Sequence, residues 1–273
     1  MTAVVEVSLM ESRLRHIEMG IGPAVILLHG MAASSCDWAA LMPALASLGY
    51  RALAVDLLGH GDSPKPEDPR AYTLDNCYQS LEAWVADLAL QPPLILIGHS
   101  LGGYLCLEFA LRHAQQVAAL ALVDPLYKLG QISPLLRLFK GRADLGAKAM
   151  EAVPLELIDR LLAWDLASLA GFSPEARRQI AIDYKRASPN ILHFTQDIQD
   201  LTPSLGQIHS PTLVVWGERD LTLRPASFPV LVARLPNATG HSLPRSGHQP
   251  HIGQPVRVNR MILDFLAEHI ASG

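Results

Sequence analysis

Short apolar runs, each closed by a small or polar residue, constrain the fold of this 273-residue chain more than any other feature. The runs occupy residues 24–30, 51–59, 94–100, 117–125 and 212–220. Continuous apolar runs of this length are typical of strands that are covered on both faces. Between the first four runs, apolar residues recur at three- and four-residue steps, which predicts helices. Alternating strands and helices predict an α/β fold with a mostly parallel sheet flanked by helices on both sides.

Other strands and a closing helix are expected outside these runs. Residues 5–9 alternate between apolar and polar side chains, and a second short strand is expected over about 13–18. After the fifth run, a last strand that includes His241 and a helix over about 255–270 would complete the fold.

A long interval between the fourth and fifth runs interrupts this rhythm. About 80 residues separate Val123 from Thr212, which is too long for an ordinary crossover. Serine followed by proline, a pattern typical of helix starts, occurs there at Ser133-Pro134, Ser173-Pro174 and Ser188-Pro189. The sequence therefore predicts a core formed by residues 1–125 and 209–273, with a helical lid, or cap, inserted at 126–208.

Composition excludes several classes of function. The formal charge is −4, from 26 acidic and 22 basic residues, which argues against a nucleic-acid surface or an anionic membrane partner. No apolar stretch approaches the roughly 20 residues that span a bilayer, and the first residues do not resemble an export signal. We therefore expect a cytoplasmic protein. The sequence does not indicate its oligomeric state.

The segment LILIGHSLGG, residues 94–103, combines a predicted strand with a predicted helix start. A residue at such a sharp corner is strained, and neighbours without a β-carbon are needed on either side of it. Gly98 and Gly102 meet that need around Ser100. The pattern therefore predicts a nucleophile elbow, in which Ser100 presents its hydroxyl beyond the carboxyl end of the strand. The N–H of Leu101, directly after it, can then stabilise an oxyanion.

On these residues, and on LLHGMAAS, DLLGHGDS, VVWGERD and SGHQPH, the chain resembles the α/β-hydrolase superfamily from about residue 10 to 270. The resemblance is to its lidded serine esterases and carbon–carbon hydrolases. It implies an α/β-hydrolase fold and a catalytic triad in the chain order serine, acid, histidine. It assigns Ser100 as nucleophile, Asp220 as acid and His248 as base. It also implies that the N–H of Met31 is the second donor of the oxyanion hole.

Alternatives remain for the acid and the base. Asp124 also follows a predicted strand, where some superfamily members carry the acid, and Glu218 is a weaker candidate. His251 and His241 compete with His248 for the role of base. His29 and His60, in glycine-containing turns, are expected to make structural hydrogen bonds.

The predicted chemistry is hydrolysis of a carboxylic ester through an acyl-enzyme on Ser100. A serine hydroxyl is a poor nucleophile at neutral pH, so it needs a base such as histidine and a carboxylate that orients that base. The alternatives are a hydrolase of ring-fission diketones, a cofactor-free perhydrolase, and a non-catalytic receptor for small ligands on the same fold. No cofactor and no metal site are expected, because HExxH and paired-cysteine motifs are missing from the sequence.

The substrate is expected to be a small, apolar ester. The predicted lid is rich in leucine and isoleucine and contains Trp164, and no anchor for a charged substrate is evident there.

Overall fold

The computed structural model describes residues 13–137, 142–161 and 172–270. The strand expected over residues 5–9 and the side chain of Trp164 lie outside the described residues.

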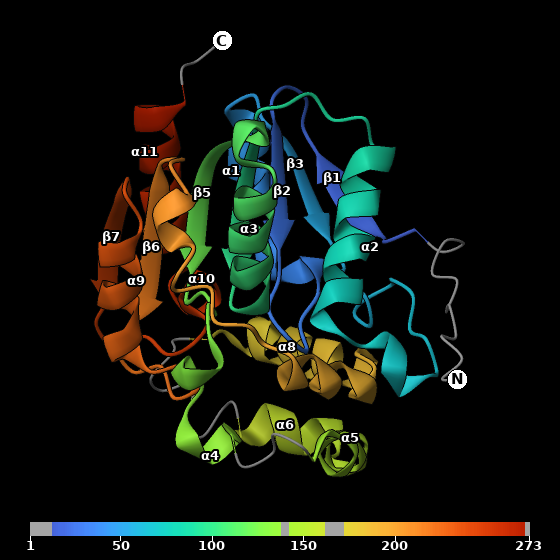
Figure 1. Ribbon diagram of the computed structural model, residues 1–273. Coiled ribbons are helices and arrows are strands. Elements are labelled where there is room, and N and C mark those ends of the chain that lie inside the picture. Colours follow the sequence, from blue (N-terminus) through green and yellow to red (C-terminus); the bar gives the residue numbers. More distant parts are fainter. Residues whose placement is uncertain (1–12, 138–141, 162–171, 271–273) are drawn as a thin grey trace, which may run out of the picture.

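A twisted sheet in the strand order β1-β3-β2-β4-β5-β6-β7 runs through the centre of the described chain (Figure 1). Only β1 is antiparallel to its neighbour, and every other pair is parallel. The strands are β1 His16–Met19, β2 Ala24–Leu28, β3 Arg51–Val55, β4 Leu94–His99, β5 Val117–Val123, β6 Thr212–Gly217 and β7 Ala238–Leu243. This arrangement confirms the predicted α/β-hydrolase architecture.

Helices cover both faces of the sheet and explain why the central strands β2, β4 and β5 are almost entirely apolar. Along β2, Ile26 and Leu28 belong to one core cluster, whereas Val25 and Leu27 belong to the other. The first cluster lies under three helices, α2 Leu74–Asp87, α3 Leu101–Arg112 and α9 Phe228–Arg234. The second lies under α1 Met42–Ser47 and α11 Pro255–His269. Successive strand residues point to opposite faces, so the central strands contribute to both cores.

The described residues between β5 and β6, here called the helical segment, are largely helical, as predicted. Its elements are α4 Pro134–Arg137, α5 Ala143–Ala152, α6 Leu155–Leu161, α8 Pro174–Arg186 and the 3₁₀ helix η6 Pro189–Gln196. The Ser173 hydroxyl accepts a hydrogen bond from the Ala176 N–H at 3.2 Å and caps α8. After Ser188, however, the chain adopts 3₁₀ geometry rather than an α-helix.

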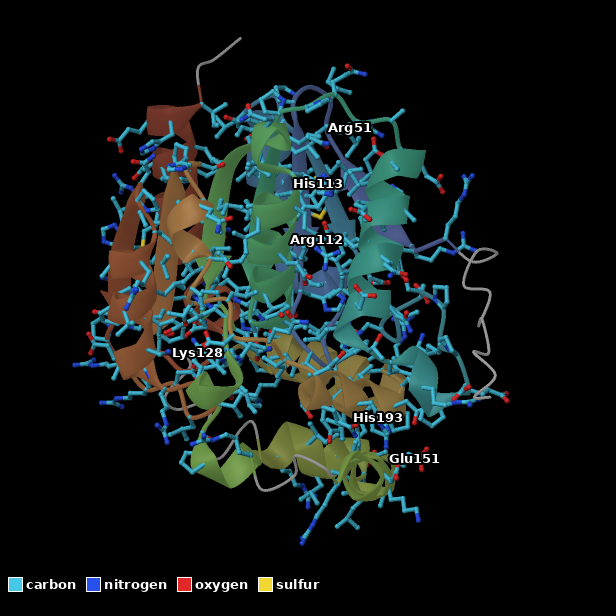
Figure 2. All side chains as sticks on the ribbon, viewed as in Figure 1. Arg51, Arg112, His113, Lys128, Glu151 and His193 are labelled. Atoms are coloured by element: carbon cyan, nitrogen blue, oxygen red, sulfur yellow. The ribbon has the colours of Figure 1, made fainter. Side chains whose placement is uncertain are left out.

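The helical segment lies beyond the carboxyl ends of the central strands, as the arrowheads in Figure 1 show. Figure 2 marks the two ends of the molecule: Lys128, Glu151 and His193 lie at the end with the helical segment, and Arg51 and His113 at the other. In open α/β sheets, ligands bind outside the carboxyl ends of the strands. The helical segment therefore lies beside the edge where a ligand site is expected.

Candidate active site

Ser100 occupies the sharp corner between β4 and α3. Its backbone angles are φ 50° and ψ −110°, in a region that residues with a side chain rarely adopt. The Ser100 carbonyl accepts hydrogen bonds from the N–H groups of Tyr104 and Leu126, and its own N–H donates to the Val123 carbonyl. These bonds hold the strained residue in place. The corner has the geometry expected of a nucleophile elbow.

The glycines beside Ser100 are required by close backbone approach. A β-carbon on Gly98 would lie 2.5 Å from the carbonyl oxygen of Gly102. A β-carbon on Gly102 would lie 2.2 Å from the carbonyl oxygen of Leu28. Both distances are far below van der Waals contact, so the tight turn and the packing of α3 on the sheet need glycine at these two positions.

Three loops bring Ser100, His248 and Asp220 together. The Ser100 hydroxyl lies 3.0 Å from Nε2 of His248, and Nδ1 of His248 lies 2.7 Å from Oδ2 of Asp220. The imidazole can therefore donate from Nδ1 to the carboxylate and accept the Ser100 proton at Nε2. Residues that are far apart in the sequence thus form a continuous hydrogen-bonded chain.

The environment of Asp220 favours the ionised carboxylate. Its side chain is fully buried, and Oδ1 accepts hydrogen bonds from the N–H groups of Thr222 and Leu223 at 2.7 and 2.9 Å. Burial raises the pKa of Asp220, but the neighbouring His248 and these hydrogen bonds outweigh it, and the pKa lies below its ordinary value. An ionised Asp220 can hold His248 in one tautomer and stabilise it when it is protonated.

Asp124 lies close behind this acid but has a different environment. It is fully buried, its Oδ1 accepts a hydrogen bond from the Gly217 N–H at 3.0 Å, and its Oδ2 lacks a hydrogen-bond partner within the described chain. Burial and repulsion by Asp220 raise the pKa of Asp124 well above its ordinary value. The surroundings of Asp124 therefore favour its protonated form, in contrast to those of Asp220. Asp124, Asp220 and His248 each place one polar atom within 4.8 Å of the others.

The remaining candidates for acid and base point elsewhere. Glu218 is exposed and accepts a hydrogen bond from the Ser242 hydroxyl. His241 is exposed on β7. His29 and His60 accept hydrogen bonds from the N–H groups of Leu57 and Ala32, in the structural role expected for them.

A second buried cluster lies behind His248 and was not foreseen from the sequence. Nε2 of His99 donates to the carbonyl of His248 at 2.7 Å. Its Nδ1 lies 3.9 Å from the Asp37 carboxylate, and Nε2 of His251 lies 3.7 Å from the same oxygen. His251 also stacks on Trp38, with ring centroids 4.8 Å apart. His99, the residue before Ser100, thus links the end of β4 to the backbone of the loop that carries His248.

Two sets of side chains among the described residues are close enough to share a metal ion. One is Asp37, His99 and His251, and the other is Asp124, Asp220 and His248. In the second set, Nδ1 of His248 already donates to Asp220. Neither set belongs to a sequence motif that is typical of zinc sites.

Met31 and Leu101 present their backbone N–H groups without hydrogen-bond partners among the described residues. Leu101 is the first residue of α3, where the orphan N–H groups of the helix and its dipole favour negative charge. Both residues also line the cavity that contains the Ser100 side chain.

That cavity has a volume of about 500 Å³ and lies between the sheet edge and the helical segment. Its wall is mainly aliphatic, with Leu126, Ile132, Met150 and Ile198 among its members. Arg137 and Arg142 also line it, in contrast to the expectation of a pocket without a charged anchor. Local sequence pattern does not indicate this position, because arginines next to a helix end are usually solvated.

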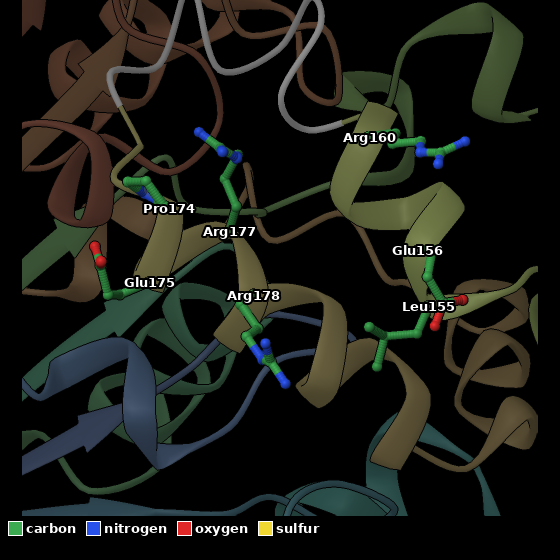
Figure 3. Close-up of a pocket in the computed structure, with 7 residues that line it drawn as sticks. All are labelled: Leu155, Glu156, Arg160, Pro174, Glu175, Arg177 and Arg178. Atoms are coloured by element: carbon green, nitrogen blue, oxygen red, sulfur yellow. The ribbon is translucent and has the colours of Figure 1, made fainter.

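Another hollow, of about 570 Å³, opens between α6 and α8 (Figure 3). None of Ser100, Asp220 and His248 lines it. Its charged side chains are those of Glu156, Arg160, Glu175, Arg177 and Arg178. Charges of both signs around an open hollow are typical of a solvated surface, so the cavity at Ser100 is the better candidate for a ligand site.

The fold and this site together define a hydrolase. The family model described as alpha/beta hydrolase fold matches residues 23–255, and the chain belongs to this family.

Several known proteins share the fold. The chain is 30% identical over 266 residues to the putative carbamate hydrolase RutD of Variovorax paradoxus, a match that covers 92% of this chain and 94% of the relative. It is 38% identical over 109 residues to bifunctional epoxide hydrolase 2 of Rattus norvegicus, covering 40% of this chain but only 20% of that protein. A thermophilic esterase from Thermogutta terrifontis, solved with malate bound, superposes with a TM-score of 0.80 at 25% identity, over 94% of each chain.

Among the described helices, none is long and apolar enough to span a membrane.

Proposed function

We propose that this protein is a serine esterase that cleaves carboxylic esters through an acyl-enzyme. The observation that carries this proposal is the chain of hydrogen bonds from Ser100 through His248 to Asp220. Ser100 is the nucleophile, His248 the base and Asp220 the acid that orients it. The helical segment acts as a lid that excludes water from the cavity.

The reaction follows from these positions. The Ser100 oxygen attacks the ester carbonyl while Nε2 of His248 takes the hydroxyl proton. The N–H groups of Met31 and Leu101 stabilise the oxyanion of the tetrahedral intermediate. His248 then protonates the leaving alcohol. In the second half, His248 takes a proton from water, and the resulting hydroxide attacks the carbonyl of the acyl-enzyme. The bond to the Ser100 oxygen then breaks, His248 returns the proton to that oxygen, and the acid is released.

Serine as nucleophile favours this reaction over the epoxide-hydrolase branch, which uses aspartate at this position. The raised pKa of Asp124 and the lowered pKa of Asp220 favour Asp220 as the acid, because an ionised carboxylate is needed to stabilise the protonated imidazole.

The test is a burst experiment with 4-nitrophenyl butyrate. The wild-type protein should release 4-nitrophenol in a burst that matches the enzyme concentration, and intact-mass measurement should find the butyryl group on Ser100. The Ser100→Ala variant should give neither. Ser242→Ala, which alters an exposed serine on β7, is the matched control and should retain both. Turnover of the ester by Ser100→Ala at the wild-type rate would contradict the proposal.

A further inference from the structure

The cavity at Ser100 has a positively charged side chain in an apolar wall. Arg137, the last residue of α4, lines this cavity. Its Nε atom is buried and lacks a hydrogen-bond partner within the described chain. Arg142, which precedes α5, lines the same cavity and is exposed overall.

Acidic side chains that could neutralise Arg137 are missing from the described lining of the cavity. The carboxylate closest to the chemistry, Asp220, has a fully buried side chain that is bonded to His248. A buried guanidinium N–H without a partner is unfavourable, since it has lost its water and gained no hydrogen bond. A group that arrives with the substrate can supply the missing acceptor.

A carboxylate is the group that best fits Arg137. The guanidinium presents N–H donors in a planar fork, which matches the two oxygens of a carboxylate. The mainly aliphatic lining that Arg137 and Ser100 share suits a short hydrocarbon chain, and about 500 Å³ is room for a small molecule.

We propose that Arg137 anchors a carboxylate of the substrate, so that the enzyme prefers small esters that carry a free carboxylate remote from the ester bond. This inference rests on the proposed esterase function and specifies its substrate class. Arg142, an exposed residue that lines the same cavity, attracts the anion toward the site but is not required to bind it.

The proposal assigns the two ends of the substrate to two residues that line the cavity. The ester carbonyl binds at Ser100, beside the N–H groups of Met31 and Leu101. The carboxylate binds at Arg137, at the end of α4. Chain length is then selected by the distance between the two sites, whereas a neutral ester of the same length gains only apolar contact.

The experiment compares matched pairs of methyl esters by titrating the acid released. Monomethyl glutarate, adipate and pimelate are each paired with the neutral methyl ester of the same number of chain carbons: pentanoate, hexanoate and heptanoate. The wild-type protein should have a higher kcat/KM for the anionic member of at least one pair. One member of the series should be optimal.

Arg137→Gln should reduce the ratio of kcat/KM for the anionic ester over the neutral ester by about 10- to 100-fold, the range typical of a lost hydrogen bond to a charged group. Arg137→Lys, which keeps the charge and loses the fork, should give an intermediate ratio. Arg178→Gln removes the same charge from an exposed arginine of the helical segment outside this cavity, and should leave the ratio unchanged.

Calorimetric titration of Ser100→Ala with the preferred monomethyl ester separates binding from chemistry. Binding should weaken when Arg137→Gln is added. A wild-type ratio that does not exceed one for any pair, or equal ratios in Arg137→Gln and Arg178→Gln, would overturn the carboxylate anchor while leaving the esterase intact. Absence of Ser100-dependent hydrolysis of both esters would instead contradict the esterase function itself.

Discussion

Two neighbouring aspartates have pKa values that are shifted in opposite directions, because their surroundings differ. Asp220 contacts His248 and two backbone N–H groups, whereas one oxygen of Asp124 is buried without a donor among the described residues. The first environment stabilises the carboxylate, and the second favours the protonated acid.

The first prediction concerns the role of this pair in catalysis. Asp220→Asn should reduce kcat by up to about 10⁴-fold, a magnitude that comes from the corresponding change in a serine protease. Asp124→Asn should have a much smaller effect, because an amide resembles a neutral carboxylic acid and can still accept from the Gly217 N–H. Steady-state kinetics with 4-nitrophenyl butyrate would measure both, and a larger loss for Asp124→Asn would reverse the assignment of the acid.

The second prediction concerns stability at the same position. The pKa of Asp124 is raised in the folded state, so between about pH 4 and that raised pKa the folded protein binds more protons than the unfolded chain. The contribution of Asp124 to stability is thus full below about pH 4 and is lost as the pH rises. As the pH rises from 4 to 8, the wild type should lose stability that Asp124→Asn does not lose. The free energy of unfolding of the variant should therefore increase relative to that of the wild type. Urea unfolding across this range measures the difference, and a constant difference would contradict the raised pKa.

Among the secondary-structure elements, the fit of α3 against the sheet determines where Ser100 lies. The first turn of α3 packs so closely on the end of β2 that Gly102 has no room for a methyl group. The loops after β6 and β7 meet equally closely, since a β-carbon on Gly217 would lie 2.1 Å from the Gly247 carbonyl oxygen. Such contacts between backbones place Asp220 and His248 beside Ser100.

The third prediction tests this packing. Gly102→Ala should destabilise the protein by about 1–3 kcal/mol, the usual cost of inserting a methyl group where there is no space. It should also reduce kcat, because α3 must move and carry Leu101 with it. Gly206→Ala is the matched control, because a methyl group at that position would meet nothing within 4 Å. In thermal unfolding, Gly102→Ala should have a lower midpoint temperature than Gly206→Ala. Equal midpoints would show that α3 accommodates the added methyl group without loss of stability.

At the scale of the whole molecule, burial of polar groups couples folding to pH. His60 is fully buried: it accepts from the Ala32 N–H, bonds the Leu58 carbonyl through Nδ1, and stacks on Phe194 of the helical segment at 6.4 Å. Burial, with the neighbouring His29, lowers the pKa of His60 well below its ordinary value.

The fourth prediction follows from this shift. Below about pH 6.5 the unfolded chain protonates His60 while the folded protein does not, so stability falls as the pH falls. Through His60, the free energy of unfolding decreases by at most about 1.4 kcal/mol for each pH unit. His60→Asn, compared with the wild type by urea unfolding from pH 7.5 to 5, should show a shallower fall. Parallel curves would mean that His60 takes up a proton in the folded state.

Much of the architecture could be predicted from local pattern. The apolar runs 94–100 and 212–220 contain β4 and β6, and Ser173-Pro174 begins α8 as expected. These features depend on short-range rules of burial and capping, so they are visible in a few consecutive residues. The 3₁₀ geometry after Ser188 was not predictable in this way, because α-helix and 3₁₀ helix begin with the same residues.

The amino-acid order was enough to predict the class of fold and the residues that could meet at the sheet edge, because strand ends and the sharp corner follow from periodicity and glycine positions. Which of these residues do meet depends on the folded chain. The opposite pKa shifts of Asp124 and Asp220, the contact of His99 with the histidine loop, and the position of Arg137 in the cavity depend on groups brought together from distant parts of the chain. Burial and Coulomb energy depend on distances in space, and spacing along the sequence does not contain them.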